Sequence, residues 1–294
     1  MIRSREGDPA YDVTWAWERG PLSPGLTAVL RVKNEARNLP WVLPPMFEAV
    51  QRIVLVDNQS TDGTPEVAVS VAESCRASDR LTVASYPFDV ARCGPEHLAT
   101  PGDSVHSLTH FYNWSFSFVE TELSMKWDGD MVLTAEGVAA VADLAWQLEG
   151  SETVVLIPRH PVSVESDSVA YVDLGMRFRE PWIYPMGPGY TFLKAFEWEL
   201  RDFPDSAVRL HLPEGLCVEL KWLDADEFGH WSSPTAFHNA RTPRKQREWE
   251  VDQAIRAGTW SSYDGVHRVV APAGVHVVDH VVGTWLPSRT RPLR

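Results

Sequence analysis

Short apolar runs and amphipathic stretches alternate through the first half of the chain. Four apolar runs of strand length lie at residues 26–32, 52–57, 81–85 and 123–128. Four stretches of helical character lie at 38–50, from Thr64 onwards, at 104–120 and at 134–149. The run 53–56 is apolar at every position, which is typical of a parallel strand covered on both faces. The alternation predicts an α/β fold with a mostly parallel central sheet flanked by helices and right-handed crossovers.

The pattern becomes β-rich in the second half. Short β-like runs, separated by proline and glycine, lie at 153–157, 169–174, 190–193, 208–212 and 216–222. A charged helix is expected at 244–257. The apolar runs 266–271 and 275–282 flank a Pro-Ala-Gly turn, so we expect them to pair as a hairpin.

No low-complexity linker or internal repeat divides the chain. We therefore expect an extended N-terminal lead-in at 1–25, a first half at 26–135 and a second half of the same domain at 136–294. The formal charge is −13, from 27 basic and 40 acidic residues, and this field argues against a nucleic-acid partner. Three cysteines give no disulfide framework, and no run reaches the ~18 apolar residues of a transmembrane segment. A cytoplasmic location is the expectation.

Polar segments follow three of the predicted strands. They are Arg31-Val32-Lys33-Asn34-Glu35 after the first strand, Asp57-Asn58-Gln59-Ser60-Thr61-Asp62 after the second and Lys126-Trp127-Asp128-Gly129-Asp130 after the fourth. Ligands of open α/β sheets bind at the carboxyl ends of the strands, and these ends lie along one edge. We therefore expect the three segments to converge on one site.

Asp128 and Asp130 follow an apolar strand with one glycine between them. Residues two apart in an extended segment point to the same side, so both carboxylates converge on one point. Hard oxygen ligands of this kind suit Mg²⁺ or Mn²⁺ bound together with substrate phosphates. The alternative is a pair of solvated aspartates in an ordinary turn. The position on a rim with two other polar segments favours the metal.

Asp57 ends a buried strand, where a carboxylate without a partner is costly. We expect it to accept a hydrogen bond from the N–H of a nucleotide base. Asp62 is expected to cap the helix that begins at Thr64, since a side-chain oxygen there satisfies free amides of the turn. The alternative gives Asp57 a capping role too.

The strings RVKNEARNLP, VLVDNQSTDGTPE and KWDGDMVL, in this order, resemble the family 2-type glycosyltransferases, which have the GT-A fold. The resemblance covers residues 26–135. It implies that the first half binds a UDP- or GDP-linked sugar, that the second half binds the acceptor, and that Asp130, with Asp128, holds Mn²⁺ or Mg²⁺. The residues it assigns to the nucleotide sugar are Arg31, Asn34, Glu35, Asp57, Asn58, Asn113 and Asp128.

The second half departs from the pattern of that family. Its members carry an acidic pair or a single carboxylate there as catalytic base, and no Glu-Asp pair occurs here. The candidates for the base are Glu180, which we favour, then Asp173, Asp224, Asp226 and Glu227. A carboxylate beside apolar rings, such as that of Trp182, has a raised pKa, which improves a base. The alternative for Glu180 is an ion pair with Arg177 or Arg179.

Other candidates in the sequence stay open between two roles. Glu219 or His238 is expected to supply a third metal ligand, and the alternative for both is a surface role. Three tryptophans are candidates to pack against an acceptor sugar, namely Trp182, Trp222 and Trp231, although most tryptophans serve the core. His106 and His110 are four residues apart, and ordinary packing or capping explains them better than metal binding.

We predict a metal-dependent glycosyltransferase that moves a sugar from a nucleotide-diphosphate donor to a carbohydrate or other hydroxyl acceptor, with inversion. A metal stabilises the leaving diphosphate, and a base takes the acceptor proton. One alternative is a catalytically inactive carbohydrate-binding protein on the same fold. Another is a sugar-phosphate nucleotidyltransferase, which needs a glycine-rich loop after the first strand. The segment RVKNEARN has no glycine, and this argues against that enzyme and against dinucleotide binding.

Overall fold

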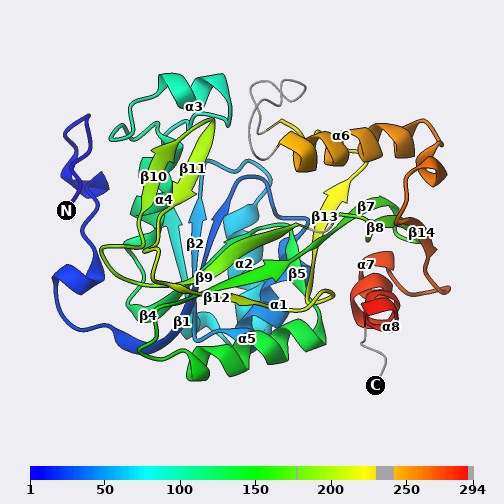
Figure 1. Cartoon of the computed structure of the whole chain (residues 1–294), viewed down its shortest axis with the longest axis horizontal. Helices are drawn as coiled ribbons and strands as arrows, with labels where there is room; N and C mark the ends of the chain where they lie inside the picture. Colours follow the sequence, from blue (N-terminus) through cyan, green and yellow to red (C-terminus); the bar gives the residue numbers. More distant parts are fainter. Residues whose placement is uncertain (177, 230–241, 291–294) are drawn as a thin grey trace.

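The structure is a computed structural model that describes residues 1–176, 178–229 and 242–290. Its centre is a seven-stranded sheet (Figure 1). In spatial order the strands are β12 (Val208–His211), β6 (Thr153–Pro158), β9 (Arg179–Pro185), β4 (Thr121–Asp128), β1 (Ser23–Val32), β2 (Arg52–Asp57) and β3 (Leu81–Ser85). The strands β4, β1, β2 and β3 are parallel neighbours, whereas β9 is antiparallel to β4 and β6. The predicted α/β fold with a mostly parallel sheet is confirmed.

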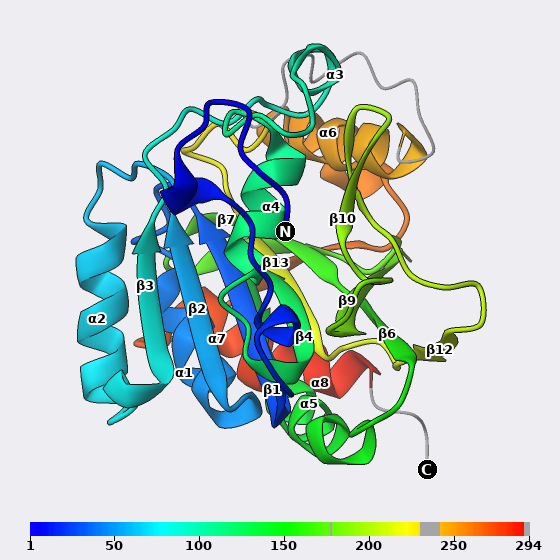
Figure 2. The ribbon, with the colours of Figure 1, turned by 90° about the vertical axis from the view of Figure 1, so that its left-hand side faces the viewer.

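Helices cover both faces of the sheet, as Figure 2 shows. One core holds Leu30 and Leu55 with the helices α1 (Leu39–Ala49), α2 (Thr64–Ser74) and α5 (Ala135–Gln147). A second core on the other face holds Val29 and Val54 with α4 (Leu108–Phe116). Successive residues of a strand point to opposite faces, so continuous apolar runs are what a sheet covered twice requires. The expected helix at 104–120 is shorter: α4 ends at Phe116, and Val105 and Val119 join the same core from outside the helix.

The second half adds a smaller sheet beside the first. Its order is β14 (Val266–Val270), β8 (Val169–Asp173), β7 (His160–Ser166), β13 (Cys217–Trp222) and β5 (Met131–Leu133). The helix α6 (Thr242–Arg256) lies against it, with Val251 and Ile255 in contact with the core residue Tyr171. A separate hairpin of β10 (Phe192–Ala195) and β11 (Trp198–Arg201) stands beside α4, near the short helix α3 (Pro95–Ala99).

The predicted hairpin of 266–271 and 275–282 is wrong. The first run is β14, which pairs with β8, and the second forms α7 (Val277–His280), a π-helical turn at 281–285 and α8 (Leu286–Thr290). The valines at 277, 278 and 281 are fully buried on one helical face. Burial of this face outweighs the strand preference of β-branched residues.

The N-terminal lead-in is more ordered than its composition predicts. It contains two short 3₁₀ turns, at Pro9–Tyr11 and Ala16–Glu18, and Val13 and Trp15 are buried in the core beside α4. Short 3₁₀ turns also lie at Ser78–Arg80 and Trp260–Ser262. In the part of the chain that the structure describes, no helix is both long and apolar enough to cross a bilayer.

Candidate functional site

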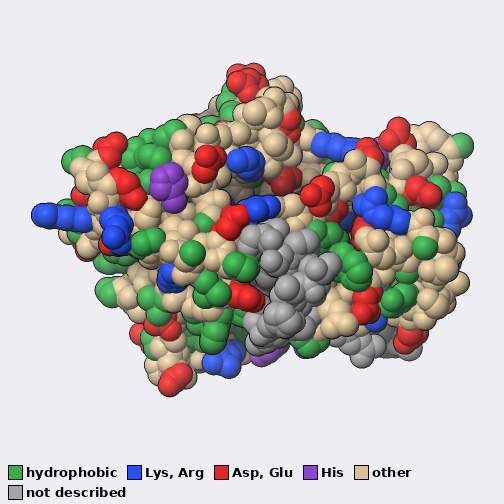
Figure 3. Space-filling view, turned by 90° about the horizontal axis from the view of Figure 1, so that it is seen from above, with side chains coloured by type: hydrophobic (Ala, Val, Ile, Leu, Met, Phe, Trp, Pro, Cys, Tyr) green, Lys and Arg blue, Asp and Glu red, His purple; other side chains and the backbone are tan. Residues whose placement is uncertain are grey.

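A cleft of about 780 Å³ opens at the carboxyl ends of β1 and β4. It is lined on one side by the turns after these strands and on the other by residues of β9, β11, β13 and α6. Figure 3 looks down on this side of the molecule and shows acidic and basic side chains interspersed across it. Of the predicted site residues, those that line the cleft are Arg31, Asn34, Glu35, Asn58, Asp128, Asp130 and Glu180. The predicted convergence of the first and third polar segments is therefore found.

The turns after β1 and β2 are bound to each other through backbone amides. The N–H of Asn34 donates to Ser60 Oγ at 2.8 Å, and the N–H of Thr61 donates to Asn34 Oδ1 at 2.8 Å. Asn34 has a φ of 58°, in the left-handed region that asparagine tolerates better than most residues. The side chain and the backbone of Asn34 therefore both fix the shape of this wall.

Asp62 completes the link between the two turns. Its carboxylate accepts from the N–H of Thr64 and from the N–H of Ala36, each at 3.0 Å. The predicted capping role of Asp62 is therefore confirmed. Asp57 is 7% exposed, accepts from the N–H of Ser60 at 3.2 Å, and does not line the cleft. This amide contact is what the capping alternative predicts for Asp57. The hydrogen bond from a nucleotide base to Asp57 stays a prediction.

Asp128 and Asp130 face the cleft in a densely charged environment. Burial raises the pKa of the Asp128 carboxyl, but Lys126 and Arg31 outweigh it and the net shift is downward. Arg31 donates to Asp128 Oδ1 at 2.9 Å. Burial raises the pKa of Asp130, and Glu219 and Asp128 add to this, against the opposing charge of Lys221. The two carboxylates are thus close enough to repel each other.

Gly129 allows this arrangement because the β1 turn passes directly beside it. A Cβ at Gly129 would lie 2.8 Å from Glu35 Cγ and 2.9 Å from Val32 Cγ1, closer than real carbon atoms approach. The Glu35 carboxylate accepts a hydrogen bond from Asn38 Nδ2 at 2.7 Å. Burial, together with the charge of Asp130, raises the pKa of Glu35 to about 8.

The aspartates offer oxygen atoms that suit a divalent cation. Hydrogen bonds within the described residues reach Asp128 Oδ1 and Asp130 Oδ2, and none reaches the other oxygen of either carboxylate. No group of three His, Cys, Asp or Glu side chains that could hold a metal occurs in the described ranges. Two carboxylates completed by phosphate oxygens and water are a usual Mg²⁺ site, so the donor set fits such an ion.

The opposite wall of the cleft is a chain of ion pairs. Arg159 binds Glu180 Oε2 at 2.8 Å through Nη1 and binds Glu219 through Nε. Arg244 lies 3.0 Å from Glu180 Oε1, and Lys221 Nζ lies 2.9 Å from Glu219 Oε1. The side chains of Glu180 and Glu219 are 10% and 7% exposed. The ion pair that the sequence offered as the alternative role of Glu180 is present, but with Arg159 and Arg244.

Lys221 joins this wall to the metal candidates. Its Nζ lies 2.8 Å from Asp130 Oδ2 and 3.8 Å from a carboxylate oxygen of Glu227. Both Glu219 oxygens are taken by Arg159 and Lys221, so Glu219 does not join the aspartates as a third ligand in the structure. His238, the other candidate, lies outside the described residues, as do Trp231 and Arg177.

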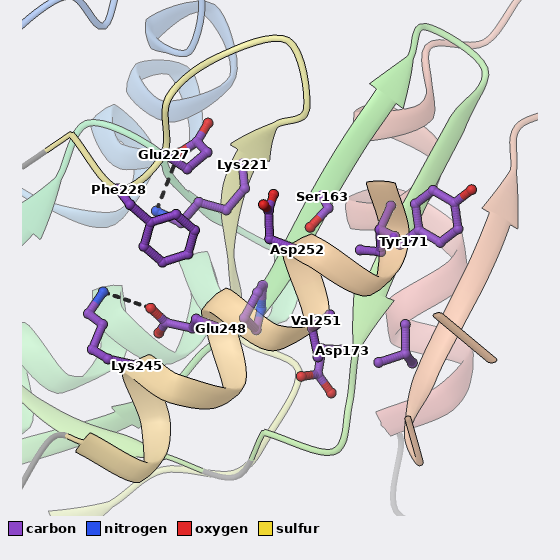
Figure 4. A pocket seen from close by; sticks show the side chains of 13 residues that line it. Ser163, Tyr171, Asp173, Lys221, Glu227, Phe228, Lys245, Glu248, Val251 and Asp252 are labelled. Carbon is purple, nitrogen blue, oxygen red and sulfur yellow. Dashed lines mark hydrogen bonds and ion pairs between the residues drawn. The ribbon is translucent and has the colours of Figure 1, made fainter. Parts of the chain in front are cut away.

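Like Asp57, the predicted residues Asp173 and Asn113 do not line the cleft. Asp173 is bound by Arg247 through two hydrogen bonds of 2.8 Å and lines a separate cavity of about 30 Å³ beneath α6 (Figure 4). In the structure Asp173 pairs with Arg247 of α6, and its role as a base stays a prediction. Asn113 is buried, and its side-chain amide binds the backbone N–H and C=O of Phe192, both at 2.9 Å. In the structure this amide holds the β10–β11 hairpin.

The remaining candidates divide between cleft, core and surface. Asp226, Glu227 and Trp222 line the cleft, and the Arg37 guanidinium lies 3.3 Å from the Trp222 ring centroid. Trp182 is fully buried, so it does not present its ring to an acceptor. Asp224 pairs with Arg37 on the surface. His106 and His110 bind backbone carbonyls, as ordinary packing predicts.

Sequence reasoning missed several residues that line the cleft. They are Tyr112, Arg159, Glu199, Lys221, Arg244 and Lys245. Lys221 had a usable signal, since Glu219 and Lys221 are two apart in a strand and face the same side. The others come from segments far apart in sequence, and no local pattern marks them.

Comparison with known proteins gives one family match. Residues 3–140 match the family described as beta-1,4-N-acetylgalactosaminyltransferase (CgtA), which is slightly less than half of the chain. No curated protein is similar enough to count as a match.

Three solved structures are similar in part. The mannosyltransferase PcManGT from Pyrobaculum calidifontis, in complex with GDP-Man and Mn²⁺, has 14% identity and a TM-score of 0.44, covering 84% of this chain and 68% of that one. S. aureus TarS 1-349 has 13% identity and a TM-score of 0.39, covering 80% and 73%. Glucosyl-3-phosphoglycerate synthase from Mycobacterium tuberculosis, with Mn²⁺, UDP-glucose and phosphoglyceric acid, has 16% identity and a TM-score of 0.31, covering 49% and 44%. The chain thus spans under half the length of the last protein, and it spans 47% of another mycobacterial protein.

The sheet order, the polar segments at its carboxyl ends and the family match concern the same part of the molecule. The match at 3–140 includes β1, β2 and β4 and the turns that follow them. Residues 3–140 are thus similar to a glycosyltransferase family, and they contain the parallel strands whose carboxyl ends carry the cleft.

Proposed function

We propose that the chain transfers a sugar from a UDP- or GDP-linked donor to a hydroxyl acceptor, with inversion at the anomeric carbon and with Mn²⁺ or Mg²⁺ as cofactor. One observation carries the proposal. Asp128 and Asp130 share a single cleft with Asn34 and Asn58, the polar residues of the first two turns. The cleft thus holds a cation-binding pair and a polar wall for a nucleotide.

The donor is oriented by the turns and by the cations of the cleft. Asn34, Glu35 and Asn58 line the side where the nucleoside binds, and Asp57 lies behind them at the end of β2. Arg31 and Lys126 lie within 3.5 Å of Asp128, where they attract the diphosphate. The excess of acids on the whole chain does not prevent this, because the charges that act are those nearest the phosphates.

Asp128 and Asp130 would hold the divalent ion through their unshared oxygens. When bound, such an ion stabilises the negative charge that develops on the leaving diphosphate. Lys221, which contacts Asp130 at 2.8 Å, supplies a further positive charge at the same place. The acceptor oxygen needs a base as it attacks. Glu180, the residue favoured by the sequence, lines the cleft, but Arg159 and Arg244 lie against its two oxygens.

A thermal-shift experiment with the purified chain tests the proposal. UDP-, GDP- and dTDP-sugars are added with and without Mn²⁺, and one donor with Mn²⁺ is expected to raise the melting temperature by about 5 °C at 100-fold Kd. Asp130→Asn is expected to abolish the Mn²⁺-dependent part. Asp143→Asn, at an exposed position of α5, is the matched control and should behave like the wild type.

Two outcomes would count against the proposal. If no donor changes the melting temperature with either metal, the chain does not bind nucleotide sugars and the proposal is wrong. If a glycan binds equally well to wild type and Asp130→Asn, and no nucleotide is released from any donor, the inactive carbohydrate-binding protein is the better description. Slow release of the nucleoside diphosphate in the presence of Mn²⁺ is the expected result.

A further inference from the structure

Eight carboxylates line the cleft among the residues that the structure describes. They are Glu35, Asp128, Asp130, Glu180, Glu199, Glu219, Asp226 and Glu227. Seven of them accept a hydrogen bond or pair with a cation. Six of these contacts are described above, and the seventh is the N–H of Phe228, which donates to Asp226 at 3.1 Å. Glu199 differs, since no hydrogen bond or ion pair reaches its carboxylate from any described residue. It is nevertheless 6% exposed, in β11.

We propose that Glu199 is the catalytic base that takes the proton from the acceptor hydroxyl. This inference rests on the proposed function. A carboxylate whose oxygens are not occupied by a cation is free to accept a hydrogen bond from the acceptor hydroxyl, which is what a base needs. Glu180 has the opposite environment, because Arg159 and Arg244 lie at 2.8 and 3.0 Å from its two oxygens. Its contacts assign Glu180 to positioning these arginines.

Within the described residues, neither cationic side chain of the hairpin pairs with Glu199. A titratable neighbour from outside the hairpin is His97 of α3; burial lowers the pKa of this imidazole, and the charge of Glu199 opposes that shift without reversing it. Lys194 is the cross-strand neighbour of Glu199 in β10, but the Lys194 ammonium donates to the carbonyls of Leu98 and Thr100. Arg201, two residues further along β11, donates to Tyr190 O at 2.9 Å and to Ser124 Oγ at 2.8 Å. Both local cations are thus directed away from Glu199.

The hairpin is also held firmly enough to position a reacting group. Asn113 of α4 binds both backbone groups of Phe192, and Arg201 fastens the other strand to β4 through Ser124. Side chains locked on packed elements hold their geometry better than side chains on loops. These contacts fix the end of the hairpin at which Phe192 pairs with Arg201, two residues from Glu199.

Tyr112 connects Glu199 to the donor side of the cleft. Its ring lies 3.9 Å from the Arg31 guanidinium, which is paired with Asp128. Burial raises the pKa of the Tyr112 phenol; Arg31 opposes this, and the negative charges of Glu199 and Asp128 add to it. Both carboxylates therefore lie near enough to Tyr112 to act on its pKa, and all three residues line the same cleft.

The reaction balances with the chain, the donor and the acceptor alone. The acceptor oxygen forms a bond to the anomeric carbon as its O–H proton passes to the Glu199 carboxylate. The bond between the anomeric carbon and the diphosphate oxygen breaks, and its electron pair leaves with the nucleoside diphosphate. Glu199 then returns the proton to water. Water itself can take the place of the acceptor, which gives a usable assay.

The test uses the full chain, Mn²⁺ and the nucleotide sugar that gives the largest thermal shift, with water as acceptor and released nucleoside diphosphate as the readout. Glu199→Gln is expected to lower kcat by about 10²–10⁴-fold. The donor-dependent thermal shift should stay within about 1 °C of wild type. The acidic limb of the pH profile of kcat/KM should disappear. Glu197→Gln, in the same hairpin but outside the cleft lining, is the matched control and should keep its rate.

The outcomes separate the two proposals. If wild type shows a donor-dependent shift and release, and Glu199→Gln keeps more than half of kcat, the assignment of Glu199 is overturned and the proposed function stands. The same holds if Glu180→Gln, and not Glu199→Gln, removes the acidic limb. If wild type shows neither shift nor release, the proposed function itself fails. Should Glu199→Gln not fold, Glu199→Asp decides, with a 10–100-fold slower rate and a displaced acidic limb expected.

Discussion

The two walls of the cleft are built by different interactions. The turn wall, residues 33–38 and 58–64, is held by backbone amides that donate to short side chains such as Asn34 and Asp62. The ion-pair wall, Arg159, Glu180, Glu219, Lys221 and Arg244, is held by charges whose residues come from four separate segments. A contact between a short side chain and a nearby amide costs little entropy to form. A buried ion pair depends on every partner being present, because a lone buried charge is very unfavourable.

The first way to test this difference is to remove the centre of the ion-pair wall. Arg159→Met leaves Glu180 and Glu219 largely buried without their shared partner, so the free energy of unfolding should fall by about 3–5 kcal/mol. Urea unfolding monitored by tryptophan fluorescence measures it. Arg268→Met, at an exposed position of β14, should change it by less than about 0.5 kcal/mol.

A triple variant sharpens this result. The triple variant adds Glu180→Gln and Glu219→Gln to Arg159→Met. It removes the two negative charges that have lost Arg159, so it should restore part of the lost free energy of unfolding. If Arg159→Met costs less than about 1 kcal/mol, the ion-pair wall does not depend on its partners in the way described here.

The turn wall should respond less to a comparable change. Asp62→Ala removes the acceptor for the amides of Ala36 and Thr64, and the expected loss is about 1–2 kcal/mol. Asp62→Asn keeps one acceptor oxygen and should lose less. Thermal melting and urea unfolding of both variants check the order. A loss for Asp62→Ala as large as that for Arg159→Met would remove the contrast between the walls.

The smallest expected effect is on the pH dependence of the free energy of unfolding. Burial lowers the pKa of His160, in β7 beside β13, below the ordinary value of about 6.5. The unfolded chain therefore binds a proton at His160 before the folded chain does, and stability falls as pH drops below about 6.5. His160→Gln should remove part of this fall between pH 7 and 5. Urea midpoints at both pH values give the comparison, and parallel curves for wild type and variant would contradict it.

The turn wall could be predicted from the sequence because its parts are local. The strings around Asn34, Asp57 and Asp62 lie directly after apolar strands, and parallel strands bring such ends together. The capping contact of Asp62 and the close passage of the chain at Gly129 followed from residue type alone. The sheet followed from runs that are apolar at every position.

The ion-pair wall could not be predicted in the same way. Arg159 follows β6, Glu180 lies in β9 and Arg244 in α6, so their contacts exist only after the second half has folded. The strand predicted at 275–282 was wrong for a related reason, since burial against the second sheet decided between strand and helix. Glu199 has no motif around it, and only the absence of partners in the described structure distinguishes it from the other carboxylates.

Gly129 has a consequence for how the two aspartates are placed. The backbone at Gly129 packs against the side chains of Val32 and Glu35 with no room for a Cβ between them. Any side chain at position 129 would have to displace Val32, Glu35 or the segment that carries both aspartates. The distance between the two aspartates and the first turn therefore depends on the absence of a side chain at this one position.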